Sequence, residues 1–157
     1  MKRNKICLSL ITGLVLASCA TRHYEKTNDG IIVNISHAKD AALSKLRLQV
    51  LGNDLIHVSA TPDNVFPKDS SLIIVPNIGT VPFRVTEVKD SIQLATETLN
   101  VLISSKDGDV KFKDKSGKII LAESSGGGKT FSPIEVEGTK GYSIRQIFES
   151  PKDEAFY

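Results

Sequence analysis

The segment Gly126-Gly127-Gly128-Lys129-Thr130 carries residue types that could bind a phosphate group. In a phosphate-binding loop, the glycine-rich turn follows a strand, opens a helix and has a further glycine five residues before its final glycine. Here that earlier position is Glu123, and the following Phe131-Ser132-Pro133 does not favour the start of a helix. The sequence therefore predicts a flexible loop at this point rather than a nucleotide site.

Side chains that could support acid–base, nucleophilic or metal chemistry are dispersed along the chain. The three histidines have no Cys, Asp or Glu at metal-ligand spacing; they are His23, His37 and His57. The acidic residues fall on turns and polar strand faces, where solvation explains them, and no serine occupies the sharp strand-to-helix turn that a nucleophile would need. We therefore predict no catalytic, metal-binding or cofactor-binding residue in this chain.

The first 18 residues have the pattern of a secretory signal. Lys2, Arg3 and Lys5 form a positive patch, and Ile6 to Val15 is an apolar stretch. A charged segment followed by a short apolar segment is typical of exported proteins. The apolar stretch is also shorter than the ~20 residues that a bilayer-spanning helix needs. We expect residues 1–18 to be removed.

Leu16-Ala17-Ser18-Cys19 resembles the lipobox of bacterial lipoproteins, in which a bulky apolar residue and two small residues precede a lipid-bearing cysteine. The resemblance implies that Cys19 becomes the first residue of the mature chain and that membrane lipid is a partner. Several acyl chains give stable attachment, because each buried CH₂ contributes about 0.8 kcal/mol. The alternative is an ordinary signal in which Cys19 is incidental. Ala20 is not the aspartate that commonly retains lipoproteins in the inner membrane, which favours the outer membrane of a Gram-negative cell.

The charge and the cysteine content limit the other functions that the chain could have. Three of the 20 Lys and Arg lie in residues 1–18 and none of the 18 Asp and Glu do, so the remainder has a net charge of about −1. No basic stripe points to a nucleic acid, and the lysines from Lys111 to Lys118 fit one solvated hairpin face. Cys7 would leave with the signal, so the mature chain would have no disulfide.

Beyond a polar tether at 19–28, short runs rich in Ile, Val, Leu, Thr and Phe alternate with turn residues, and the only helical candidate is the short 41–48 stretch. Leu46-Arg47-Leu48-Gln49-Val50 has the period-two alternation of a strand with one buried face. The pattern predicts an all-β domain over 29–157, an antiparallel β-sandwich of two sheets. The candidate strands are 31–35, 46–51, 55–60, 72–75, 83–88, 92–96, 99–104, 110–113, 119–122, 134–137 and 142–148.

The C-terminal phrase Ile147-Phe148-Glu149-Ser150-Pro151-Lys152-Asp153-Glu154-Ala155-Phe156-Tyr157 resembles the end of the N-terminal β-sandwich of glycoside hydrolase family 31. In those α-glucosidases and α-xylosidases, a similar phrase leads into a Tyr-Gly-Leu-Gly segment. The resemblance covers residues 24–157. Upstream segments that fit the same order are Gly30–Val33, Leu46–Val50, Leu55–Val58, Ala60–Pro62 and Asp114–Ile119.

The resemblance implies a galactose-mutarotase-like sandwich, incomplete at Tyr157, that packs on a catalytic (β/α)₈ barrel. The barrel and its two aspartates are absent from this sequence, and no sugar-binding residue can be carried over. We therefore expect a truncated product or fragment: a non-catalytic N-terminal domain that shapes the entrance of an absent barrel. The alternatives are a free-standing carbohydrate-binding β-sandwich lipoprotein and a structural envelope lipoprotein.

Overall fold

The computed structural model describes residues 22–36, 43–67, 81–126 and 128–150. Within these ranges the chain consists of strands, turns and bends, and it has no helix, so none that could cross a membrane. The prediction of an all-β fold is confirmed. Cys19, His37 and the candidate strand at 72–75 lie outside the described residues.

The first sheet has four antiparallel strands in the order β1-β2-β3-β4. They are β1 (Tyr24–Lys26), β2 (Gly30–Asn34), β3 (Lys45–Val50) and β4 (Ile56–Thr61). In β3 the predicted alternation holds, because every second side chain is buried and the intervening Lys45, Arg47 and Gln49 are only half-buried. Strands that are consecutive in the chain are also adjacent in this sheet, as in a β-meander.

The second sheet has five antiparallel strands in the order β5-β6-β7-β8-β9. They are β5 (Arg84–Val88), β6 (Ser91–Ala95), β7 (Asn100–Ser104), β8 (Val110–Lys113) and β9 (Ile119–Ala122). The inward-facing residues of β6 and β7 pair across the strands, Ile92 with Ile103 and Leu94 with Val101, and all four are buried.

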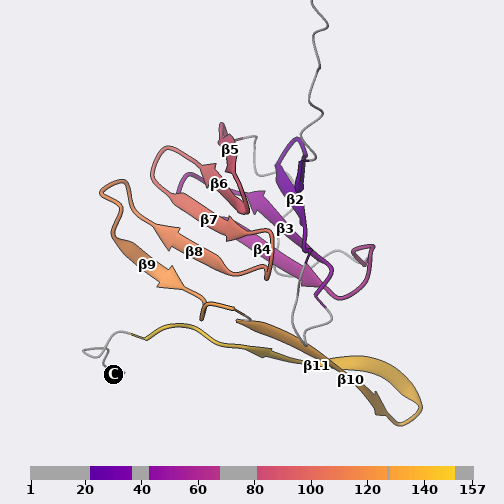
Figure 1. The fold of residues 1–157 in the computed structure, drawn as a ribbon. Coiled ribbons are helices and arrows are strands. Elements are labelled where there is room, and N and C mark those ends of the chain that lie inside the picture. The colour runs from indigo at the N-terminus through magenta and orange to yellow at the C-terminus, as the bar shows by residue number, and fades with distance from the viewer. Residues whose placement is uncertain (1–21, 37–42, 68–80, 127, 151–157) are drawn as a thin grey trace, which may run out of the picture.

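The two sheets lie face to face and enclose one core (Figure 1). The first sheet contributes aliphatic side chains from β2 and β3, and the second contributes those from β6, β7 and β8. The buried members are Ile31, Val33, Leu43, Leu46, Leu48, Val50, Ile92, Leu94, Val101, Ile103, Val110 and Phe131. Full burial of such a side chain stabilises the fold by about 1.5–3 kcal/mol. The predicted antiparallel β-sandwich is confirmed.

The last two strands form a long hairpin, β10 (Lys129–Val136) and β11 (Thr139–Gln146), that extends beyond the sandwich (Figure 1). The sequence placed the first of these strands at 134–137 and Lys129 in a loop, so the start was wrong by five residues. The proline at 133 misled the assignment, but an isolated two-stranded hairpin has free edges that tolerate proline. After β11 the chain returns beneath β9, where Phe148 pairs with Glu123.

The sandwich also begins earlier than expected. Tyr24–Lys26, which the sequence assigned to the tether, pairs with β2 as an edge strand. Its three residues are too few and too polar to show alternation. A contact with the other sheet accompanies this strand, because His23 Nδ1 lies 2.6 Å from Glu87 Oε1 and the His23 backbone N–H donates to the same oxygen at 3.3 Å.

The turn between β1 and β2 is fixed by the Asp29 carboxylate. It accepts hydrogen bonds from the Thr27 hydroxyl at 2.8 Å and from the Gln49 amide at 2.7 Å, and Arg47 lies 3.5 Å away. Partial burial raises the pKa of Asp29, but the hydrogen bonds from Gln49 and Thr27 and the Arg47 charge outweigh it. The pKa of Asp29 is therefore below its ordinary value.

Two glycines with positive φ test how tightly the turns join the core. Gly108 has φ of +78° and a Cβ there would lie 2.5 Å from Leu43 Cδ2, whereas Gly117 has φ of +87° and open space around it. We expect Gly117→Ala to cost about 1–2 kcal/mol through the left-handed backbone alone. Gly108→Ala should cost about 1–3 kcal/mol more, because it also overpacks the core. Urea unfolding of both variants measures the difference, and equal losses would contradict the contact with Leu43.

The lowered pKa of Asp29 predicts a pH-dependent contribution to stability. A carboxylate with a depressed folded-state pKa stabilises the fold above its unfolded pKa, near 3.8, and loses that contribution as the pH falls through the folded value. Asp29→Asn should therefore be less stable than wild type at pH 7, by about 1 kcal/mol or less for so exposed a group. The difference should shrink below pH 3.8. Urea unfolding at several pH values checks this, and a pH-independent difference would refute it.

Candidate functional site

The glycine-rich segment is organised by a carboxylate of the chain itself. Asp109, at the end of the turn between β7 and β8, accepts the backbone N–H of Gly126 at 2.6 Å and that of Gly128 at 3.1 Å. Backbone N–H groups converging on one anion are the element that a phosphate-binding loop would supply to a ligand. Here the chain's own carboxylate takes that position.

Lys129 is committed to an interior ion pair. Its Nζ donates to Glu123 Oε2 and, at 2.9 Å, to the Gly108 carbonyl. Glu123 Oε2 also accepts the Val110 backbone N–H at 2.9 Å, and Glu123 Oε1 accepts the Gln146 amide. The exposed fractions of Glu123 and Lys129 are 2% and 5%. We refer to Asp109, Glu123, Lys129 and Gln146 as the base cluster, because these residues lie at the base of the hairpin, where it leaves the sandwich.

Sequence reasoning missed the base cluster. Its members are spread from Asp109 to Gln146 in the chain, and Lys129 follows a glycine run that is typical of a loop. Two local signals were available: Glu123 ends the apolar run Ile119–Ala122, and Lys129 lies two residues before Phe131, hence on the same face of a strand. Phe131 is buried. An acidic and a basic side chain at inward-facing positions indicate a buried ion pair.

Beyond the base cluster the hairpin presents an apolar face to solvent. Phe131, Pro133, Tyr142 and Ile144 share one side of the two strands, as their register requires. The rings of Phe131 and Tyr142 meet edge to face with centroids 6.2 Å apart. Large exposed apolar side chains lie on both faces of the hairpin, on the segment that follows it and on β9; they are Ile119, Ile120, Leu121, Ile134, Val136, Tyr142, Ile144, Ile147 and Phe148. We call this set the hairpin apolar surface.

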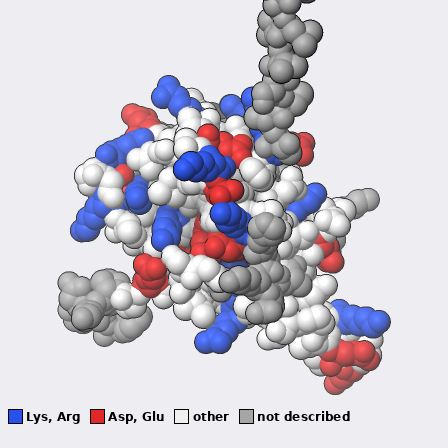
Figure 2. All heavy atoms as spheres, viewed as in Figure 1, with Lys and Arg blue, Asp and Glu red and all other residues white. Residues whose placement is uncertain are grey.

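Charged residues lie at the two ends of this hairpin: Lys129 and Arg145 at its base, and Glu135, Glu137 and Lys140 at or near its tip. In Figure 2 the end of the hairpin, at the lower right, carries acidic and basic side chains, while its stem is largely uncharged. The register places Glu135 opposite Lys140 near that end. An apolar stem rimmed by charges is typical of a surface that contacts another protein domain.

The histidines are not brought together. His23 contacts Glu87, and His57 Nδ1 lies 3.1 Å from the Gln49 side-chain oxygen in the same sheet. His37 lies outside the described residues. Among the residues that the structure describes, no group of three His, Cys, Asp or Glu side chains could hold a metal ion.

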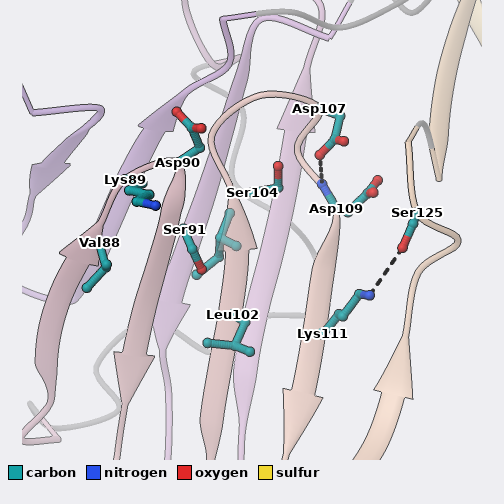
Figure 3. Close-up of a pocket in the computed structure, with 11 residues that line it drawn as sticks. Val88, Lys89, Asp90, Ser91, Leu102, Ser104, Asp107, Asp109, Lys111 and Ser125 are labelled. Carbon is teal, nitrogen blue, oxygen red and sulfur yellow. Dashed lines mark hydrogen bonds between the residues drawn. The ribbon is translucent and has the colours of Figure 1, made fainter.

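A shallow hollow of about 450 Å³ lies on the outer side of the five-stranded sheet (Figure 3). Most of its charged groups have partners within the chain. Asp107 accepts the Asp109 backbone N–H at 3.4 Å, Lys111 Nζ donates to the Ser125 hydroxyl at 3.2 Å, and Asp90 pairs with Lys106 at 2.7 Å. Asp107 and Asp109 are thus held by the turn and the glycine-rich segment.

The lysine-rich segment from Lys111 to Lys118 is a hairpin, as its composition indicated. Asp114 closes the turn by accepting the Ser116 hydroxyl at 2.6 Å and the Lys118 backbone N–H at 3.0 Å. The Ser116 hydroxyl is the main cause that lowers the pKa of Asp114, and the backbone N–H groups add to it. Lys115 Nζ donates to the Thr96 carbonyl at 2.6 Å, so this lysine supports the neighbouring turn.

Comparison with known proteins identifies the domain. Residues 45–157 match the family model described as the glycosyl hydrolase 31 N-terminal galactose mutarotase-like domain. A GH31 alpha-xylosidase from Xanthomonas citri is 43% identical, with a TM-score of 0.72, over 82% of this chain and 14% of its own. The chain therefore spans about a seventh of the length of that enzyme.

A second solved structure shares the fold at lower identity. It is a GH31 alpha-xylosidase from a soil metagenome in complex with xylose, 17% identical with a TM-score of 0.62, covering 84% of this chain and 21% of its own. The expected resemblance to family 31 is confirmed. The chain belongs to glycoside hydrolase family 31, of which it carries the N-terminal galactose mutarotase-like domain.

Proposed function

We propose that this chain is the non-catalytic N-terminal domain of an α-xylosidase-type glycosidase, in which it packs on a catalytic barrel and helps to shape the entrance of the active site. By itself the chain has no hydrolytic activity. The observation that carries the proposal is the hairpin apolar surface, which extends beyond the core that the sandwich can bury. The 43% identity to an alpha-xylosidase supports the choice of α-linked xylose as the sugar over α-linked glucose.

The position of the apolar side chains fits docking to another domain. Phe131 is buried in the sandwich core, while Ile144, which lies opposite it on the same side of the hairpin, is 64% exposed. The hairpin therefore continues the core outward, where a second apolar surface could complete it. Large apolar side chains exposed in one region of a protein mark interaction sites.

We also propose that the domain is held at the bacterial outer membrane by lipid on Cys19. The support lies in the sequence: the basic residues at positions 2, 3 and 5, the apolar stretch 6–15 and the box ending at Cys19 have the order and spacing of a lipoprotein signal. Residues 20–23 would then be the mature chain between the lipid and the first strand.

A domain exchange tests the packing role. The alpha-xylosidase from Xanthomonas citri would receive this chain's residues 22–157 in place of its own corresponding domain. We expect the exchanged enzyme to be soluble and to cleave an aryl α-xyloside, because the hairpin surface meets a compatible barrel. Ile144→Asp should reduce the soluble activity by about tenfold or more, since a charge would be buried at the junction.

The matched control is Thr86→Asp, which introduces the same charge on the exposed face of β5. It should leave the activity within about twofold, as expected of a surface substitution. An exchanged enzyme whose activity is unaffected by Ile144→Asp would contradict the packing role. A monomeric chain that binds xylose-containing oligosaccharides without a barrel would favour the free-standing binding module.

Lipid attachment depends on a single sulfur atom. We expect Cys19→Ala to abolish incorporation of radiolabelled palmitate in a Gram-negative host and to move the protein out of the membrane fraction. Cys7→Ala, within the segment to be removed, is the control and should leave both unchanged. Equal labelling of wild type and Cys19→Ala would refute the anchor.

A further inference from the structure

The direction in which the hairpin leaves the sandwich is not set by packing along its length. From Ser132 to Gln146 every residue of the hairpin is exposed. The apolar side chain that links it to the core is Phe131, at its base, which is buried in the sandwich. Something other than apolar burial must therefore fix the angle of the hairpin.

The base cluster supplies directed contacts at that point. Lys129 is the first residue of β10 and Gln146 is the last of β11, and the two are paired in the register. Both side chains donate to the Glu123 carboxylate, which follows β9. Each strand of the hairpin is thus tied by its own side chain to one anion that belongs to the sandwich.

Two further contacts tie the same anion and cation to the turn between β7 and β8. Glu123 accepts the Val110 backbone N–H at 2.9 Å, and Lys129 donates to the Gly108 carbonyl at 2.9 Å. Asp109, between these two residues, holds the N–H groups of Gly126 and Gly128 that lead into β10. Rotation of the hairpin about its base would break several of these bonds together.

Stability alone does not explain a buried ion pair. The cost of removing two charges from water often exceeds their mutual attraction, and apolar replacements of buried pairs are frequently neutral or stabilising. What an ion pair with satisfied hydrogen bonds supplies is geometry, because its partners must keep their distances and angles. Apolar contacts are non-directional and would leave the hairpin free to slide or tilt.

We propose that the base cluster is a positioning device that holds the hairpin β10–β11 in one direction and so keeps its apolar surface presented to solvent. The residues that act are Glu123, Lys129 and Gln146, with Asp109 setting the approach of the glycine-rich segment. This role concerns the chain itself and does not require that the hairpin docks on a barrel.

Distance measurement between two spin labels tests the proposal on the full chain. Cys7→Ser and Cys19→Ser remove the native thiols, and labels are attached at Thr86→Cys on β5 and Glu135→Cys on the hairpin. With the base cluster intact we expect one narrow distance maximum. Glu123→Leu combined with Lys129→Met should retain the β-rich circular dichroism spectrum but lose the single maximum, giving a broad distribution or several maxima.

The matched control is Lys106→Met, which removes an exposed ion pair with Asp90 near the same turn. It should keep the narrow maximum.

If the double variant does not fold, Asp109→Asn carries the test. This substitution leaves the ion pair and weakens the hold on Gly126 and Gly128. It should also broaden the distance distribution. A narrow, unchanged maximum in a folded double variant, or in Asp109→Asn where the double variant does not fold, would overturn the proposal.

The outcome separates this inference from the proposed function. A loss of the single maximum together with an inactive domain exchange would support the positioning role and reject the packing on a barrel. An unchanged maximum together with an active exchanged enzyme would support packing on a barrel and reject the positioning role.

Discussion

The rest of the structure depends on two facing rows of aliphatic side chains, one from each sheet. In β3 the row is Leu46, Leu48 and Val50, and in β6 it is Ile92 and Leu94, all of them buried. Because side chains alternate between the faces of a strand, a slip of one residue would turn such a row to solvent and bring Arg47 or Gln93 into the core. The register of both sheets is therefore fixed by burial. The contacts of His23 with Glu87 and of Asp29 with Gln49 lie at the periphery, whereas the Glu123–Lys129 pair is buried.

The same constraint explains what the sequence could predict. Where alternation was strong, as in Leu46–Val50, the strand and its buried face followed from the residue pattern. β1 has three polar-rich residues and was assigned to the tether, since its place in the sheet depends on pairing with β2. The start of β10 was wrong because a glycine run and a proline are loop signals, and only β11, aligned opposite, makes Lys129 a strand residue. Family membership was readable from an ordered set of segments ending at Tyr157, although no single segment is specific.

The site was harder to predict than the fold for a physical reason. A phosphate loop or a metal centre draws on residue types at fixed spacings, and Gly126–Thr130 lacks the spacing of the former. The features found instead arise from long-range contacts: Asp109 meets Gly128, and Glu123 meets Gln146. Neither contact has a signature in spacing. Local alternation could have indicated that Glu123 and Lys129 face inward, and a buried acid and base in one region imply a pair because unpaired buried charges are costly.

The fixed direction of the hairpin and its exposed apolar surface depend on each other. Tyr142 and Ile144 lie on the same side of the hairpin as Phe131, so a hairpin free to tilt could fold these side chains back against the sandwich and bury them. Apolar burial by itself would favour that collapse, at about 25 cal/mol per Å². Moving Lys129 away from Glu123 would leave two buried charges without partners, and breaking a buried pair costs roughly 3–5 kcal/mol. The extended hairpin is thus retained because the polar penalty of tilting opposes the apolar gain, and the exposed surface follows from a buried ion pair at its base.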